Sequence, residues 1–255
     1  MPGNEAEHGT TAAPDNTTLN AEVSSVVPDS NNNNKTLEDA KDLKDGQKEA
    51  DTPIRALWAE AQTHECKDVW GLVLADPAIH VPSQIVLQKY LNANNQDVAR
   101  AKEQLRSTLD WRANKKPSEL IKKKYSSEKF AGLGYITSYP IEGIIPANKE
   151  VFTWNIYGGV KDIQKSFGDL DAFIEWRVAL MEMAMRELDL ASATEPITAD
   201  NDPYKIYQVH DYKGVSFLRS PPAVRNAAKK TVEVLAMAYP ETLREKFFIN
   251  VPGKP

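Results

Sequence analysis

Arg177 is a candidate functional residue, because it interrupts a hydrophobic helix pattern. Apolar side chains recur at spacings of three and four residues between Leu170 and Leu188, and at about 100° per residue Arg177 falls near the centre of their stripe. A guanidinium group cannot shed its charge, so a carboxylate, a bound anion or a phenolate should meet it if it is buried. A structural ion pair, or a side chain whose charged end reaches water, would explain the position equally well.

A second group of candidates lies on the segment from Tyr204 to Tyr212, which we expect to be a strand. Alternation places Gln208, His210 and Tyr212 on one side of this strand, so two titratable aromatic residues share a face. At a rise of about 3.3 Å per residue they are roughly 7 Å apart along the backbone, close enough to line one pocket. A hydrogen-bonded histidine at a strand end is the simpler structural alternative. Tyr157, at the end of another expected strand, is in the same way either a pocket residue or a core or rim tyrosine.

The motifs of the commoner enzyme classes are missing from the sequence. It contains no G-x-S-x-G elbow, no P-loop and no H-E-x-x-H motif. Gly132 and Gly134 lack the third glycine of a dinucleotide-binding fingerprint, and His64 and Cys66 have no second pair with metal-ligand spacing. We therefore expect a binding protein and not an enzyme.

The composition indicates a soluble intracellular protein of one ordinary domain or two small ones. The chain has 255 residues, of which 41% are hydrophobic, and its single cysteine excludes an internal disulfide. No segment reaches the roughly 18 consecutive apolar residues of a membrane span, and the N-terminus lacks the apolar core of a secretion signal.

Residues 1–51 are expected to form a disordered acidic tail. Acidic residues outnumber basic ones there, and the first 50 residues contain no aromatic side chain. Such a segment cannot bury enough apolar surface to order itself. The remainder of the chain is close to neutral, whereas nucleic-acid binding normally requires a basic face. The composition thus argues against a nucleic-acid partner.

Helices and strands alternate in the second half of the chain. Apolar spacing, caps and prolines predict helices at residues 54–62, 83–92 with Ser83 as the N-cap, 96–109, around 120–121, 169–190 and 222–239. Short runs of aromatic and β-branched residues predict strands at 135–138, 151–157, 204–212 and 246–251. The second and third helices should pair as an antiparallel hairpin. The alternation predicts an α/β fold with a mostly parallel sheet flanked by helices.

Two segments resemble a known family. The run QKYLNANNQDVARAKEQL from Gln88, with the following Asp110-Trp-Arg, resembles the helical N-terminal module of the CRAL-TRIO, or Sec-fourteen-like, lipid-transfer family. The run YPETLREKFFINVP from Tyr239 resembles the helix-to-strand signature of that family. Segments that begin at Phe152, Glu175 and Gln208 are similar to its fungal phosphatidylinositol transfer members.

The resemblance implies a CRAL-TRIO-like lipid-binding fold and a function. It covers about residues 55–252 and implies a helical N-terminal module at 52–125 and a partial lipid- and heme-binding domain at 126–255, incomplete at the C-terminus. It further implies that the protein exchanges phosphatidylinositol between membranes and helps to regulate phosphoinositide levels. The expected location is the cytoplasm, with transient peripheral association with the endoplasmic reticulum or microsomal membrane. The oligomeric state remains open.

The resemblance also implies a heme b site, because members of this subgroup are similar to heme proteins with a tyrosinate ligand. Tyr212 would be the axial iron ligand and His210 its neighbour. Arg177 would stabilise the phenolate or a propionate, Tyr157 would hydrogen-bond at the pocket, and Lys246 would face a propionate. Primary heme binding in an oxidant-stress response is the alternative to lipid transfer as the main function.

Overall fold

A four-stranded sheet organises the C-terminal half of the chain. The computed structural model describes residues 52–141, 149–215 and 221–251, so the predicted acidic tail lies outside the described residues. The sheet has the order β3 (Gly134–Pro140), β4 (Lys149–Ile156), β5 (Ile206–Asp211), β6 (Leu243–Ile249). The β3–β4 pair is antiparallel, whereas β4–β5 and β5–β6 are parallel. The prediction of a mostly parallel α/β sheet is confirmed.

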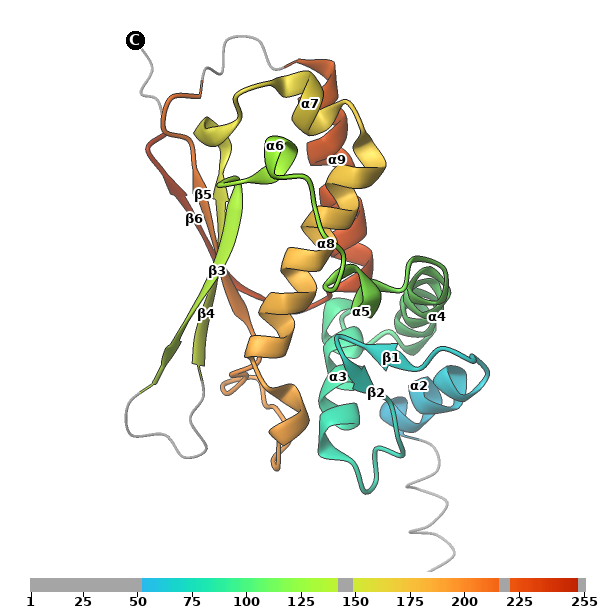
Figure 1. Ribbon diagram of the computed structural model, residues 1–255. Helices are drawn as coiled ribbons and strands as arrows, with labels where there is room; N and C mark the ends of the chain where they lie inside the picture. Colours follow the sequence, from blue (N-terminus) through green and yellow to red (C-terminus); the bar gives the residue numbers. More distant parts are fainter. Residues whose placement is uncertain (1–51, 142–148, 216–220, 252–255) are drawn as a thin grey trace, which may run out of the picture. The chain divides into compact units, whose positions relative to one another are not determined.

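The long helices lie on one side of this sheet (Figure 1). They are α8 (Leu170–Glu187) and α9 (Pro222–Ala238), accompanied by the short α6 (Ser127–Phe130) and α7 (Ile163–Phe167). Asp169 caps α8, since its carboxylate accepts a hydrogen bond of 3.1 Å from the backbone N–H of Ala172. The parallel connections from β4 to β5 and from β5 to β6 step along the sheet in the same direction, so crossovers of the usual hand place α8 and α9 on the same face.

The opposite face of the sheet carries aromatic rings in mutual contact. Tyr135 stacks on Trp154 with ring centroids 5.5 Å apart, and Phe152 stacks on Tyr207 at 4.7 Å. Tyr139 belongs to the same layer and is 51% exposed. In Figure 1 the labelled helices all lie on the other side of the sheet. The rings therefore shield the strands mainly by packing against one another.

The N-terminal part of the described chain is helical. It comprises α2 (Pro53–Gln62), α3 (Val81–Ala93), α4 (Val98–Lys115) and α5 (Pro117–Leu120), with a small hairpin of β1 (Asp68–Val69) and β2 (Leu72–Val73) that the sequence did not reveal. None of the helices in the described ranges is both long and apolar enough to span a bilayer.

Two predictions about these helices were wrong. His80 is the N-cap of α3 and Ser83 lies inside the helix, because Pro82 fits the first helical turn and the Ser83 hydroxyl instead accepts a hydrogen bond of 2.8 Å from the Ala75 N–H. The helices α3 and α4 also do not form an antiparallel hairpin. Figure 1 shows α3 from the side and α4 nearly along its axis, so the two helices cross. Asn95 and Gln96, both with positive φ, turn the chain between them.

A buried ionic cluster joins the helical part to the sheet and its helices. Arg112 of α4 donates to Glu182 of α8 at 2.6 Å and also to Asp68. Tyr239, at the end of α9, donates to the same Glu182 carboxylate at 2.6 Å. The side chains of Arg112 and Glu182 are both 0% exposed, so each charge depends on the other for compensation. The boundary that the sequence predicts between residues 125 and 126 stays a prediction.

Candidate functional site

Tyr157, His210 and Tyr212 meet at the carboxyl ends of β4 and β5. The Tyr157 hydroxyl and His210 Nδ1 are hydrogen-bonded at 2.7 Å, and the Tyr157 and Tyr212 ring centroids are 4.9 Å apart. Gly158 permits this meeting. A Cβ at Gly158 would lie 1.7 Å from the backbone oxygen of Lys213, so only glycine lets the turn after β4 approach the turn after β5.

His210 presents an unpartnered nitrogen in this cluster. Its Nε2 atom is buried and has no hydrogen-bond partner among the described residues. Burial, with the nearby positive charges of Arg177 and Lys246, lowers the pKa of His210 from 6.5 to about 4, so the imidazole is neutral at pH 7. Burial also raises the pKa of Tyr157 to about 12. A neutral Tyr157 hydroxyl that donates to Nδ1 leaves the imidazole proton on Nε2, where it can be donated to a ligand.

Arg177 of α8 reaches across to β4. It donates to the amide oxygen of Asn155, while the Asn155 side-chain N–H donates to the Val209 backbone oxygen at 3.0 Å. No carboxylate of the described residues forms an ion pair with Arg177 (contrast the ionic cluster of Arg112), and burial lowers the pKa of Arg177. The sequence suggested a carboxylate, a bound anion or a phenolate as the partner, whereas the recorded hydrogen-bond acceptor within the described residues is a neutral amide. The charge of Arg177 is thus only partly compensated.

Lys246 lies on β6 opposite Gln208, on the same side of the sheet as His210. Its side chain is exposed, and its charge contributes to the low pKa of His210. Phe248 completes the aromatic wall, with its ring centroid 5.3 Å from that of His210. The structure therefore brings the five predicted residues to one end of the sheet.

Sequence reasoning missed two residues of this cluster, Asn155 and Phe248. The period of two along a strand could have found both. Asn155 precedes Tyr157 by two positions, and Phe248 follows Lys246 by two. Neither residue was singled out, because an asparagine and a phenylalanine in strands do not by themselves indicate a ligand.

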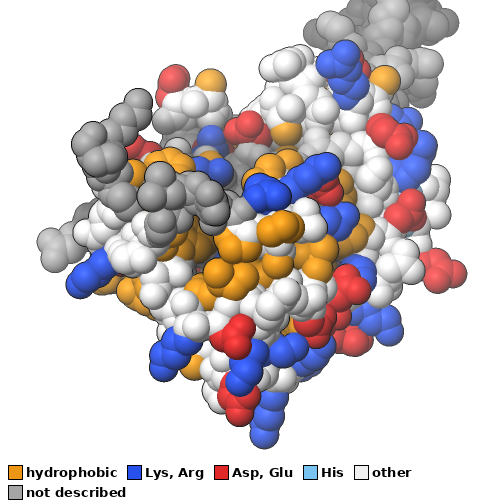
Figure 2. Space-filling view, turned by 90° about the horizontal axis from the view of Figure 1, so that it is seen from above, with side chains coloured by type: hydrophobic (Ala, Val, Ile, Leu, Met, Phe, Trp, Pro, Cys, Tyr) orange, Lys and Arg blue, Asp and Glu red, His pale blue; other side chains and the backbone are white. Residues whose placement is uncertain are grey.

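The arrangement suits an anionic oxygen atom next to apolar surface. Arg177 and His210 Nε2 can donate to it, and aromatic rings surround them. Figure 2 views the structure from the end at which α7 lies, and it shows hydrophobic side chains gathered around a hollow with Lys and Arg side chains beside it. The described residues contain no group of three or more His, Cys, Asp or Glu that could hold a metal ion, a set that does not include a tyrosine ligand.

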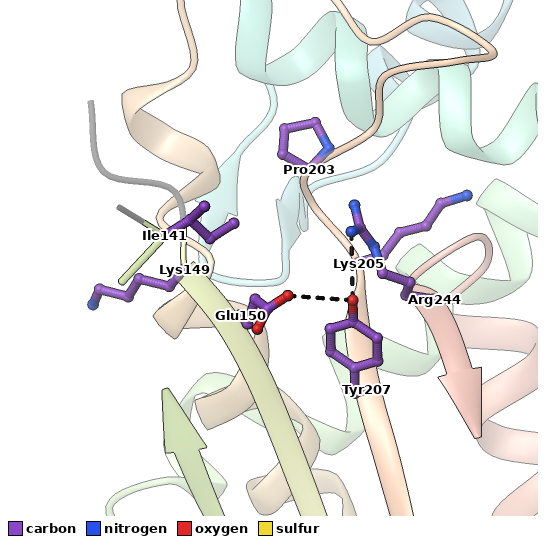
Figure 3. Close-up of a pocket in the computed structure, with 7 residues that line it drawn as sticks. All are labelled: Ile141, Lys149, Glu150, Pro203, Lys205, Tyr207 and Arg244. Carbon is purple, nitrogen blue, oxygen red and sulfur yellow. Dashed lines mark hydrogen bonds between the residues drawn. The ribbon is translucent and has the colours of Figure 1, made fainter. Parts of the chain in front are cut away.

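A second hollow, on the aromatic face of the sheet, is too small for such a ligand. Figure 3 shows the Tyr207 hydroxyl joined to Glu150 and Arg244, each 3.5 Å away. Its volume is about 20 Å³. Since one water requires roughly 10–15 Å³ on this scale, the hollow holds about one water.

Comparisons with known proteins identify one family model and several similar proteins. Residues 155–253 match the model of the CRAL/TRIO domain family. The chain is 60% identical over 203 residues to the phosphatidylinositol transfer protein SFH5 of Chaetomium globosum, a match that covers 79% of this chain and 47% of the relative. It is 57% identical over 205 residues to the SFH5 of Pyricularia oryzae, covering 79% and 50%.

A solved structure is also similar. The crystal structure of Sfh5 superposes with a TM-score of 0.63 at 27% sequence identity, covering 84% of this chain and 72% of that one. The chain spans about half the length of the curated relatives it matches. The names of these relatives describe transfer and not a reaction.

Proposed function

We propose that this chain, which carries a CRAL-TRIO domain and is a homologue of the fungal Sfh5 phosphatidylinositol transfer proteins, binds phosphatidylinositol and exchanges it between membranes. The observation that carries the proposal is the pair of donors at the end of the sheet, Arg177 and His210 Nε2, beside apolar surface. His210 Nε2 has no partner among the described residues, and the recorded acceptor of Arg177 is the neutral Asn155 amide, whereas a phosphodiester supplies an anionic acceptor.

Both the phosphodiester and the acyl chains of the lipid suit the site. A phosphodiester keeps its negative charge at neutral pH, and a hydrogen bond to a charged group contributes about 1.5–3 kcal/mol. Acyl chains gain about 0.8 kcal/mol for each methylene removed from water, so they favour the apolar hollow of Figure 2. The lipid can then leave a bilayer without exposing its chains to water.

A vesicle exchange assay tests this proposal. The chain should move labelled phosphatidylinositol from donor to acceptor vesicles, and Arg177→Met should slow the movement strongly. Arg100→Met is the matched control, because Arg100 lies on the surface with its side chain 76% exposed. Equal transfer by wild type and Arg177→Met, with both folded, would sink the assignment of the site.

We propose heme b as a second ligand, with Tyr212 as the residue that would ligate the iron. The residues present fit the group, since the site has an orphaned buried Nε2 on His210, the tyrosine ring of Tyr157, and two cations, Arg177 and Lys246. When bound, heme supplies an iron centre to which a phenolate can coordinate. A nearby cation favours the phenolate form of a tyrosine, and Arg177 and Lys246 can also pair with carboxylates.

The heme proposal has its own optical test. Chain purified from heme-replete cells should show a Soret band, and Tyr212→Phe should remove or shift it. Tyr139→Phe, on the opposite face of the sheet, is the control. A colourless wild-type preparation would refute heme binding and leave lipid exchange standing.

In the cell, this proposal places the chain in the cytoplasm, with transient contact to the endoplasmic reticulum or microsomal membrane. By delivering phosphatidylinositol there it would help to regulate phosphoinositide levels. Primary heme binding in an oxidant-stress response is the second candidate, favoured if the Soret band is present and exchange is absent.

A further inference from the structure

A groove between the helices offers a site separate from the end of the sheet. Its volume is about 500 Å³, and it is walled by α4, α5, α8 and α9. None of the five site residues described above lines it. The lining residues are Trp111, Lys115, Leu120, Leu170, Asp171, Ile174, Glu175, Val178, Lys230, Glu233, Val234 and Met237. We propose that this groove binds one monomeric single-chain lipid with an anionic head group, such as a fatty acid or a lysophospholipid.

The floor of the groove is apolar and the size suits one chain. Side chains of Leu, Ile, Val, Met and Trp contribute most of the lining. Its volume of about 500 Å³ lies in the range of roughly 300–1,000 Å³ for ligand pockets. If a methylene occupies about the 30 Å³ of a liquid water molecule, the groove holds roughly 16 of them. This is room for a single long acyl chain and not for two.

The charges that line the groove largely offset one another, so the lysines beside it set the sign of the local field. Two of the three lining carboxylates are already paired, Glu175 with Lys123 and Glu233 with Lys230 at 3.5 Å. The remaining one, Asp171, has no ion pair among the described residues. Lys115, in the last turn of α4, also has no ion pair in the described part of the chain, and its positive charge offsets the negative charge of Asp171.

The lysine run Lys122 to Lys124 makes this local field positive. The sequence favours a solvated helix end for the run, and all three residues are exposed. The ion pair between Lys123 and Glu175 holds it beside the groove. Lys122 and Lys124 have no ion pair among the described residues and can approach a carboxylate or phosphate at the groove mouth.

The test uses delipidated chain and lipids below their critical micelle concentrations. Titration calorimetry with oleate, lysophosphatidate and neutral monoolein separates carboxylate, phosphate and uncharged heads. Ile174→Trp, which fills the groove, should weaken oleate binding at least tenfold. Val232→Trp is the matched control, since Val232 is 64% exposed on α9 and does not line the groove.

A second variant avoids the risk of misfolding. Lys115→Glu with Lys124→Glu changes exposed residues only, and it should weaken the anionic lipids at least fivefold in low salt while leaving monoolein unchanged. Oleate binding that survives Ile174→Trp but disappears in Arg177→Met would place the lipid at the sheet and overturn the inference. Binding of vesicles but not of monomeric lipids would overturn it as well. Failure of phosphatidylinositol exchange alone would not, because the groove shares no residue with that site.

Discussion

Two arginines pointing into the fold should respond in opposite ways to the same substitution. Arg112 is held by the Glu182 and Asp68 carboxylates, whereas Arg177 contacts the neutral amide of Asn155. Arg112→Met and Arg177→Met remove the same charge and keep an unbranched apolar side chain. The first should cost stability, and the second should cost ligand binding.

The magnitudes follow from the partners that each substitution leaves behind. Arg112→Met strands Glu182, whose side chain is 0% exposed, and breaking such a pair costs about 3–5 kcal/mol. Arg177→Met removes a poorly compensated charge but leaves the Asn155 oxygen without its donor, a loss of about 1–3 kcal/mol. These two effects oppose each other, so the free energy of unfolding should stay within about 1 kcal/mol of wild type.

Ligand binding should be weakened by Arg177→Met and not by Arg112→Met. Loss of one charged hydrogen bond to a phosphate, about 1.5–3 kcal/mol, weakens binding by about 10- to 150-fold. Urea unfolding of ligand-free protein measures the first quantity, and phosphatidylinositol exchange per folded molecule measures the second. The reasoning fails if Arg177→Met unfolds as easily as Arg112→Met while exchange by its folded fraction is unchanged.

Further predictions concern pH, backbone geometry and the aromatic face. The folded pKa of His210 is about 4 against 6.5 when unfolded, so the unfolded state binds the proton first and the unfolding free energy should fall as pH drops from 6.5 to 4. His210→Gln should flatten this dependence in urea titrations, and an unchanged slope would contradict the burial of the ring. Gly158→Ala should disrupt the site and lower the melting temperature, because the new Cβ would meet the Lys213 backbone oxygen at 1.7 Å. Gly159→Ala is the control, since its new Cβ would meet no atom nearer than the Leu133 side chain at 3.1 Å, and equal melting temperatures of the two variants would refute this reasoning. Tyr139→Ser should reduce self-association of the chain in sedimentation, because the exposed aromatic face lacks a covering helix among the described residues. If the wild-type chain associates and the variant sediments identically, this face is not the contact.

The sequence was sufficient for the elements that have a strong local signal. The periodicity of α8, the prolines that open α2 and α9, and the alternation in β5 each predicted an element close to its observed bounds. The hairpin of β1 and β2 escaped prediction because its strands have two residues each, too few for alternation to show. The crossing of α3 and α4 escaped because the short polar joint between them fixes neither their direction nor their packing.

The candidate site was predictable in its residue types and not in its contacts. Alternation along one strand placed His210 and Tyr212 on the same face. Their contact with Tyr157, however, depends on the close approach of two turns at Gly158. Likewise the helix period indicated that Arg177 lies on the apolar side of α8. That its recorded acceptor is Asn155, and not a carboxylate, follows from the register of β4 against β5, which the sequence does not specify.

The position of the phosphate in a complex tests the central claim most directly. A crystal structure with a short-chain phosphatidylinositol should place a phosphate oxygen within hydrogen-bonding distance, about 3 Å, of His210 Nε2 and of the Arg177 guanidinium. A complex in which the phosphate lies elsewhere, and both donors keep only the partners they have without lipid, would contradict it.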